Sequence, residues 1–200
     1  VNSISNLNLS SCTSLESIGD YAFDSNEISS INLSSCTALQ TIKEHAFSEN
    51  IITSLDLSSC AALQTIANYA FYKNTIASID LSSCAALQAI GTQAFRYNFI
   101  ASIDLSSCTI LQYIGISAFY NNTLTSFTLP TPIIPEYFFE HWYDAAGNAY
   151  SGNSVVTNLA NSYTALQLYT LKDNDVVVNS GEISSCSYDF TYTDINIPST

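Results

Sequence analysis

The sequence predicts an α/β repeat solenoid, built from short parallel strands and short helical turns, followed by a small β-rich module. Three observations lead to this prediction. A cysteine recurs at a fixed interval of 24 residues, an apolar–polar–apolar triplet precedes it, and prolines interrupt the repeat near residue 130. A fixed period of this size is the signature of structural units stacked in a line. The repeated cysteines are Cys12, Cys36, Cys60, Cys84 and Cys108.

The repeat is clearest in residues 52–75 and 76–99, which are identical at 15 of 24 positions. Within the first of these copies, Leu55-Asp56-Leu57 alternates apolar and polar residues. This alternation predicts a half-buried strand. The Ser-Ser pair that follows indicates that the chain turns there.

The second half of each copy has the spacing of a helical turn. Leu63 and Ile66 are three residues apart, and Ala70-Phe71 follows Ile66 at the next helical spacing. We expect Asn74 to end this turn, because asparagine tolerates the left-handed conformation of a tight corner.

Apolar residues recur in register in every copy, and stacking is expected to bury them as columns. Successive strands are then expected to pair in parallel, about 4.8 Å apart. The inward columns are predicted to be Ile28, Ile52, Ile76 and Ile100; Phe23, Phe47, Phe71, Phe95 and Phe119; and Ala22, Ala46, Ala70, Ala94 and Ala118.

The segments Ile90–Phe95 and Ile114–Phe119 carry the pattern I-G-x-x-A-F. With the strand pattern before them, the copies resemble the BspA-like (Treponema-type) leucine-rich repeats. The resemblance implies a curved solenoid over residues 1–129, made of five 24-residue repeats. It also implies a bacterial protein that is secreted or displayed on the cell surface.

The repeat ends at Pro130, Pro132 and Pro135, which remove backbone donors from a sheet ladder. We therefore expect a Pro-rich linker at residues 130–136 and a small β-rich module at 137–200. An aromatic strand is expected from residue 137, and further short strands at 155–157 and 165–169. This stretch, from Tyr137 to Tyr169, resembles the second half of an internalin-type B repeat (the Listeria–Bacteroides repeat), with His141 in place of its glycine. Residues 195–198 resemble the opening strand of a further repeat array.

Composition excludes two classes of partner. The net charge is −13, and the only cations are Lys43, Lys73, Arg96 and Lys172, so nucleic-acid binding is not expected. No apolar run approaches the ~20 residues of a membrane span, so membrane insertion is not expected. The chain starts at Val1, inside a repeat and without methionine, which suggests a processed or excised fragment.

The five periodic cysteines are predicted to form a ladder of buried, reduced thiols. Side chains of one column point the same way, which gives poor geometry for disulfides even at a suitable spacing. Metal binding is not expected, because the sequence has no C-x-x-C motif and no histidine near the cysteines. Cys186 lies outside the ladder and is expected to be unpaired.

No catalytic constellation is found in the sequence, and neither a cofactor nor an enzymatic activity is expected. His45 occupies a column that varies between copies, so we interpret it as solvent-facing. His141 has no matching nucleophile or metal-ligand set and is interpreted as an aromatic neighbour. The many serines recur as Ser-Ser pairs at turns, which is an architectural pattern.

Two sets of residues are candidates for binding a partner. Asp56, Asp80 and Asp104 occupy the outward slot of the strand, which faces the concave side in this fold. They are expected either to be solvated or to bind a cation or a basic partner. The second set consists of aromatic residues in variable slots, which either form a recognition surface or pack against the following module: Tyr72, Tyr97, Phe99, Tyr113 and Tyr120.

These observations favour a non-catalytic, secreted or cell-surface scaffold for protein recognition or adhesion. A glycan-binding surface module is the first alternative, because exposed tyrosines beside Asp and Asn suit stacking on sugars. A structural spacer within a larger surface protein is the second. The expected partner is therefore a protein, from a host or a matrix, or a glycan.

Overall fold

The computed structural model describes residues 4–131 and, beyond them, the strands of the C-terminal region. Each 24-residue repeat forms one coil with two strands. The first strands are β1 (Asn6–Asn8), β3 (Ser30–Asn32), β5 (Ser54–Asp56), β7 (Ser78–Asp80), β9 (Ser102–Asp104) and β11 (Ser126–Thr128). The second strands are β2 (Ser17–Ile18), β4 (Thr41–Ile42), β6 (Thr65–Ile66), β8 (Ala89–Ile90) and β10 (Tyr113–Ile114).

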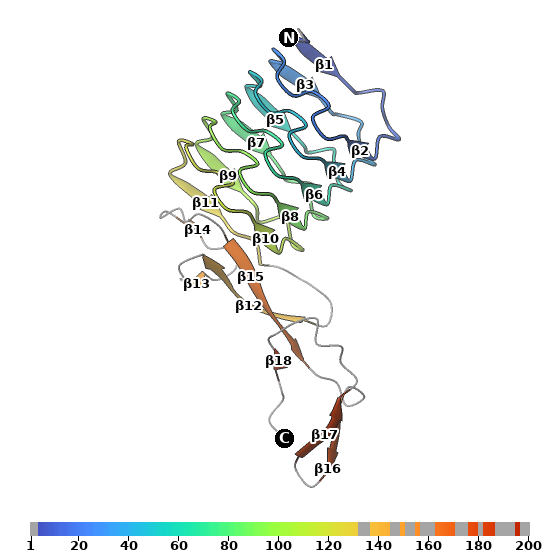
Figure 1. Ribbon diagram of the computed structural model, residues 1–200, viewed down its shortest axis with the longest axis vertical. Helices are drawn as coiled ribbons and strands as arrows, with labels where there is room; N and C mark the ends of the chain where they lie inside the picture. The colour runs from blue at the N-terminus through green and yellow to red at the C-terminus, as the bar shows by residue number, and fades with distance from the viewer. Residues whose placement is uncertain are drawn as a thin grey trace.

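The strands of successive coils lie side by side in two rows (Figure 1). All pairs between successive coils are parallel and join residues 24 positions apart, as in Leu55↔Ile79 of the first row and Ile42↔Ile66 of the second. The second row runs without interruption from β2 to β10. The predicted solenoid of stacked, parallel strands is therefore confirmed.

The predicted helical turns were wrong. The described residues contain strands and turns but no helix, so this region is a β-solenoid. The residues interpreted as helical form β6 and the turns after it. Tyr69 and Lys73 have φ of 58° and 50°, which ends any right-handed spiral. The N–H of Phe71 donates to the carbonyl of Ala94 in the next coil at 2.8 Å rather than to a residue four positions earlier.

The role expected for Asn74 was also wrong. The positive φ belongs to Lys73 and to its equivalents in the other coils, not to the asparagine. Asn74 is buried, and its side-chain amide bonds to backbone groups of two coils. The asparagine is therefore needed for its hydrogen bonds rather than for its backbone conformation.

The predicted core columns are confirmed in the inner coils. The isoleucines from Ile28 to Ile100 and the phenylalanines from Phe47 to Phe95 are fully buried. The Phe rings form one continuous stack, with centroids 5.2 or 5.3 Å apart and planes within 10° of parallel. Each ring is thus covered by equivalent rings of the adjacent coils, which couples neighbouring coils.

The five periodic cysteines are free thiols, and all except the half-buried Cys12 are buried, as predicted. The sulfurs of Cys36 and Cys84 face backbone carbonyls of the preceding coil. The Sγ of Cys36 lies 3.4 Å from the oxygen of Leu9, and that of Cys84 lies 3.5 Å from the oxygen of Leu57. The ladder therefore provides small apolar side chains that are also weak donors.

Strands of the C-terminal region pair with the last coils. β15 (Tyr163–Thr170) adds antiparallel to β10, and β14 (Val155–Val156) adds antiparallel to β11. β12 (Tyr137–Asp144) lies between β15 and β13 (Ala149–Tyr150). Both rows of the solenoid are thereby extended by antiparallel strands, which protects edges that would otherwise be open.

The remaining described strands are β16 (Val176–Asn179), β17 (Glu182–Cys186) and β18 (Ile195–Asn196); β16 pairs with β17, and β18 pairs with β15. Residues 132–136 of the predicted linker lie outside the described residues, as do the side chains of His141 and Cys186. The resemblance to the Listeria–Bacteroides repeat stays a prediction.

Candidate recognition surface

The three aspartates lie in adjacent, exposed slots of the first strand row. Asp56 pairs with Asp80 in the sheet register, and both side chains are exposed. Each Oδ1 accepts the backbone N–H two residues later, at 2.9 Å from Ser58, Ser82 and Ser106. Asn8 and Asn32 accept the same bond in the first two coils. This column therefore closes the turn after each strand.

In the middle coil of the three, these turn bonds also favour the charged form of the aspartate. The hydroxyl and the backbone N–H of Ser82 hold the pKa of the Asp80 carboxyl below its ordinary value. Within the part of the chain that the structure describes, no group of three or more His, Cys, Asp and Glu residues is placed to hold a metal ion. A basic partner for this face stays a prediction.

Three of the five aromatic candidates are brought together by the turns that return from β6, β8 and β10. The ring of Tyr72 meets that of Tyr97 edge-on, with centroids 5.7 Å apart. The Cζ of Arg96 lies 4.7 Å from the centroid of Tyr97 and 5.1 Å from that of Tyr120. Phe99, which is 58% exposed, lies two residues beyond Tyr97. We call Tyr72, Arg96, Tyr97, Phe99 and Tyr120 the aromatic edge.

Arg96 is the residue that links this edge, and sequence reasoning missed it as a site residue. Its Nη1 donates to the Oε1 of Gln93 at 2.8 Å, and its Nη2 donates to the hydroxyl of Tyr97 at 3.1 Å. The Nε is buried and has no acceptor among the described residues. Arginine at the centre of an aromatic group was visible in the sequence only as one of four cations.

A second aromatic stack was also missed. The ring of His45 lies between those of Tyr21 and Tyr69, with centroids 4.7 and 4.6 Å apart and planes within 7° of parallel. His45 is therefore half-buried, with a tyrosine ring on each face, rather than fully exposed to solvent. Tyr69 meets Tyr72 edge-on at 5.6 Å, so this stack continues into the aromatic edge. The signal was the recurrence of planar rings at one column, 24 residues apart.

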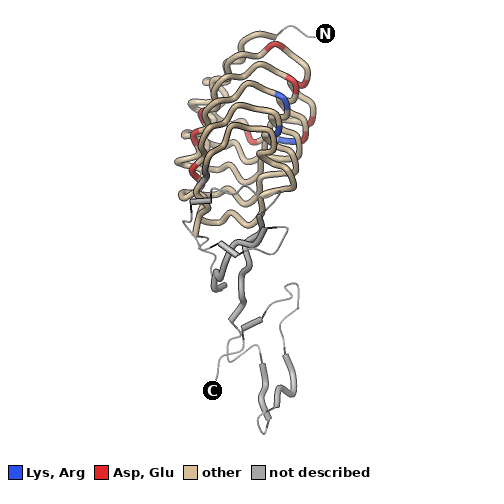
Figure 2. Tube along the Cα trace, turned by 90° about the vertical axis from the view of Figure 1, so that its left-hand side faces the viewer, with Lys and Arg blue, Asp and Glu red and all other residues tan. Residues whose placement is uncertain are grey.

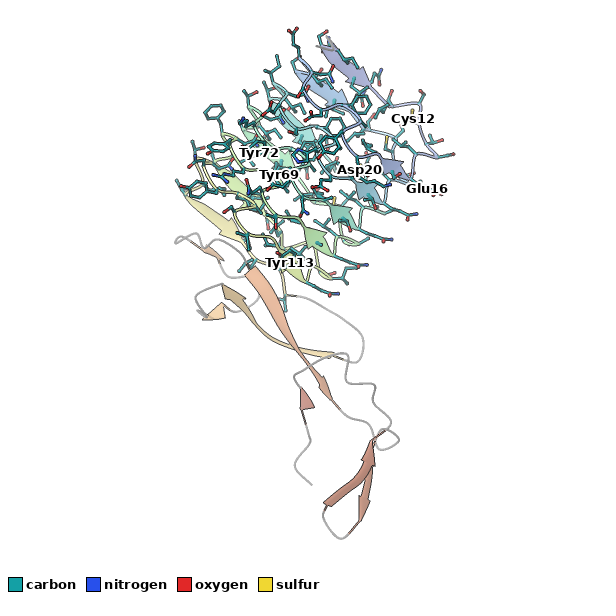
Figure 3. All side chains as sticks on the ribbon, viewed as in Figure 1. Cys12, Glu16, Asp20, Tyr69, Tyr72 and Tyr113 are labelled. Atoms are coloured by element: carbon teal, nitrogen blue, oxygen red, sulfur yellow. The ribbon has the colours of Figure 1, made fainter. Side chains whose placement is uncertain are left out.

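Tyr113 lies apart from the aromatic edge. It belongs to β10, in the second strand row, and its backbone pairs with Thr164 of β15. Figure 3 labels it at the C-terminal end of the solenoid, away from the neighbouring labels of Tyr69 and Tyr72. Tyr113 thus lies beside a strand of the following region, and packing of its side chain against that region stays a prediction.

Charge is distributed unevenly over the solenoid. Figure 2 shows acidic segments on both its left and its right side and the basic segments on its right side. Six of the acidic residues fall within residues 16–49, whereas residues 81–103 carry Arg96 as their single charged residue. Lys73 is neutralised by Glu49, with Nζ 2.8 Å from Oε1. Arg96 is thus the one charged member of the aromatic edge, on a protein of net charge −13.

The family comparison agrees with the repeat architecture. A family model described as "BspA type Leucine rich repeat region" matches residues 16–144 in six copies. One copy more is matched than the five repeats counted from the sequence, and β11 supplies the first strand of a sixth coil. The comparisons with curated proteins and with solved structures find no match. No helix in the described residues has the length and apolarity needed to cross a membrane.

Proposed function

Because the chain belongs to the BspA-type leucine-rich repeat family, we propose that it is a non-catalytic scaffold that recognises a partner protein through its aromatic edge. The family is a class of protein-interaction scaffold. The observation that carries the choice of surface is the exposure of Tyr97 and Tyr120 around Arg96, with the exposed Phe99 two residues beyond Tyr97. Tyrosine and arginine are the residues that most often dominate binding energy at protein interfaces.

The inward columns and the aspartate column of the solenoid already have structural roles. The inward columns are buried, and the aspartate oxygens close turns. The side chains of the aromatic edge differ from coil to coil, and Phe99 has no equivalent aromatic residue in the other coils. Side chains that are exposed and not required by the repeat are those that can carry specificity.

We place this scaffold in a secreted or cell-surface protein with a role in adhesion, because its family is typical of bacterial surface proteins. The polar, sparsely charged surface agrees with this, since charged residues make up 10% of the chain. An antibody raised against the solenoid tests this location. We expect it to label intact cells, and labelling only after permeabilisation contradicts the proposal.

A glycan is the alternative partner, supported by the exposed rings of Tyr97 and Tyr120 beside amide side chains such as Gln93. A spacer role is the second alternative, in which this region binds nothing. Binding on a glycan array would distinguish a glycan partner from a protein partner. Deletion of the solenoid from the parent protein without loss of adhesion would favour the spacer role.

The test of recognition uses a displayed peptide library selected on the whole chain. Selected peptides are then measured against Tyr97→Ala/Tyr120→Ala and against Tyr21→Ala, which removes another exposed tyrosine at the far end of the solenoid. We expect the double variant to bind at least ~10-fold more weakly and the control to bind normally. A selection that yields no binder, or binders indifferent to both variants, contradicts the proposal.

A further inference from the structure

Arg96 stands out among the cations of the solenoid. Lys43 is exposed to water, and Lys73 is paired with Glu49. Arg96 is half-buried, and no carboxylate of the described residues lies within ion-pair distance of it. A guanidinium removed from water without a counter-charge is unfavourable, although its stacking on two tyrosines offsets part of that cost.

The guanidinium is held in place rather than free to move. Gln93 and the hydroxyl of Tyr97 each accept one of its N–H groups, and the rings of Tyr97 and Tyr120 lie within about 5 Å of its Cζ. Each terminal nitrogen has two N–H groups, so one on Nη1 and one on Nη2 remain for a ligand. A group fixed in this way loses little conformational entropy on binding.

The charge around Arg96 favours an anionic ligand. No other charged residue occurs between Asp80 and Asp104 in the sequence, and both of these aspartates end strands of the first row. Carboxylates form charge-assisted, often bidentate hydrogen bonds with guanidinium groups. The aromatic rings on either side supply flat apolar surface for the residues next to that carboxylate.

We propose that Arg96 is the anchor for an Asp or Glu carboxylate on an extended peptide segment of the partner protein, with Tyr97 and Tyr120 packing against the adjacent residues. This inference rests on the proposed recognition function and specifies its chemistry. Tyr72, Tyr97 and Tyr120 lie on three successive coils, a span of about 10 Å. An extended peptide covers that distance with about three residues.

The chain offers a direct probe of this site, because Arg96 is its single arginine. Its Nε–H is buried, so it should give one slowly exchanging resonance in a 15N-labelled sample without ambiguity of assignment. The probes are two blocked tetrapeptides, one with Tyr-Glu and one with Tyr-Gln at its centre. Titration at ~0.15 M salt screens the repulsion between the acidic protein and the acidic peptide.

We expect the Glu peptide to shift the Arg96 Nε–H resonance along a saturable curve and the Gln peptide to bind at least ~10-fold more weakly. Tyr97→Leu should weaken the Glu peptide by a similar factor. Lys73→Gln, which removes a cation at the same edge that already has a partner, should leave it unchanged. Equal responses to the two peptides overturn the inference, as does an effect of Lys73→Gln equal to that of Arg96→Gln.

Failure of this inference can be told apart from failure of the recognition function. Library peptides that bind the wild-type chain and Arg96→Gln equally well overturn the anchor and leave the scaffold function standing. A library selection that yields no binder overturns both. Enrichment of Asp or Glu next to an aromatic residue on the wild type, lost on Arg96→Gln, supports both.

Discussion

The side-chain amide of Asn74 donates to the backbone carbonyl of Phe47, 27 residues earlier, at 2.8 Å. The same side chain accepts the N–H of Ile52 at 3.1 Å and donates to Phe71 of its own coil at 3.3 Å. Asn50, Asn98 and Asn122 repeat this arrangement. A column of asparagines, buried in the inner coils, therefore satisfies backbone groups at the turn that leads back to the first strand row.

Asn74→Ala should lower the free energy of unfolding by about 3 kcal/mol, because it leaves the buried N–H of Ile52 without a partner and removes one donor each from the carbonyls of Phe47 and Phe71. Asn26→Ala is the matched control. Asn26 accepts from Ile4 and donates to Asp24 but has no carbonyl of an earlier coil to reach, so we expect a loss of about 1 kcal/mol. Urea unfolding measures both values, and equal losses contradict a role in joining coils.

Phe71→Ala should cost about 3–5 kcal/mol, since it truncates a large buried side chain. The Phe71 ring lies between those of Phe47 and Phe95, at 5.3 and 5.2 Å, so amide exchange should also quicken in both neighbouring coils. Phe99→Ala, at a position 58% exposed, should change stability by less than ~0.5 kcal/mol. An unchanged melting temperature for Phe71→Ala would show that the phenylalanine stack does not stabilise the fold.

The parts of the fold that could be predicted are those that the period determines. Once Cys60 and Cys84 show the interval of 24, the register of Ile66 on Ile90 follows, and so do the buried columns. The conformation within one coil could not be predicted in this way. Leu63, Ile66 and Ala70 have helical spacing, and all three side chains are buried. The backbone that buries them is not a helix, because it consists of the two-residue strand β6 and turns with left-handed residues at Tyr69 and Lys73.

The residues of the candidate site also divide into those that the sequence could predict and those that it could not. Tyr72, Tyr97 and Tyr120 were identifiable as residues that vary on an otherwise constant repeat, and the structure brings them together. Arg96 could not be selected, because its importance comes from its position between rings of two coils. Asp80 was selected for its charge, whereas the structure shows that its carboxylate caps a turn.

The buried thiols give a prediction for alkaline pH. Burial raises the pKa of Cys84 from its ordinary value of 9.0 to about 12, with smaller effects of Cys108 and Cys60, and burial is also the main cause of the value of about 12 for Cys108. The unfolded chain therefore releases these protons before the folded one. The contribution of these neutral thiols to the stability of the fold is therefore complete below about pH 9 and is lost as the pH rises towards about 12.

Stability measured by urea unfolding should accordingly fall across this range, and Cys84→Ala should make the fall less steep. Alkylation in a Cys186→Ser background should modify Cys12 first, because it is the half-buried member of the column. Cys36, Cys60, Cys84 and Cys108 should react only on unfolding. Rapid modification of all five in the folded protein contradicts the ladder.

The aspartate column allows charge and turn formation to be separated. Asn8 and Asn32 accept the same turn bonds as the aspartates, at 3.0 and 3.1 Å. The triple variant Asp56→Asn, Asp80→Asn and Asp104→Asn should therefore keep the fold, with a melting temperature within a few degrees of the wild type, while removing three charges. The corresponding triple alanine variant loses the turn bonds as well and should be clearly less stable.

Comparing the triple asparagine variant with Tyr97→Ala/Tyr120→Ala decides which face binds. If the aromatic edge carries recognition, the asparagine variant should bind the selected peptides as the wild type does, and Tyr97→Ala/Tyr120→Ala should not. If the aspartates attract a basic partner, the asparagine variant should lose affinity, most strongly at low salt, where charges are least screened. Normal binding by both variants places recognition outside the two candidate sets and makes the spacer role the better account of the solenoid.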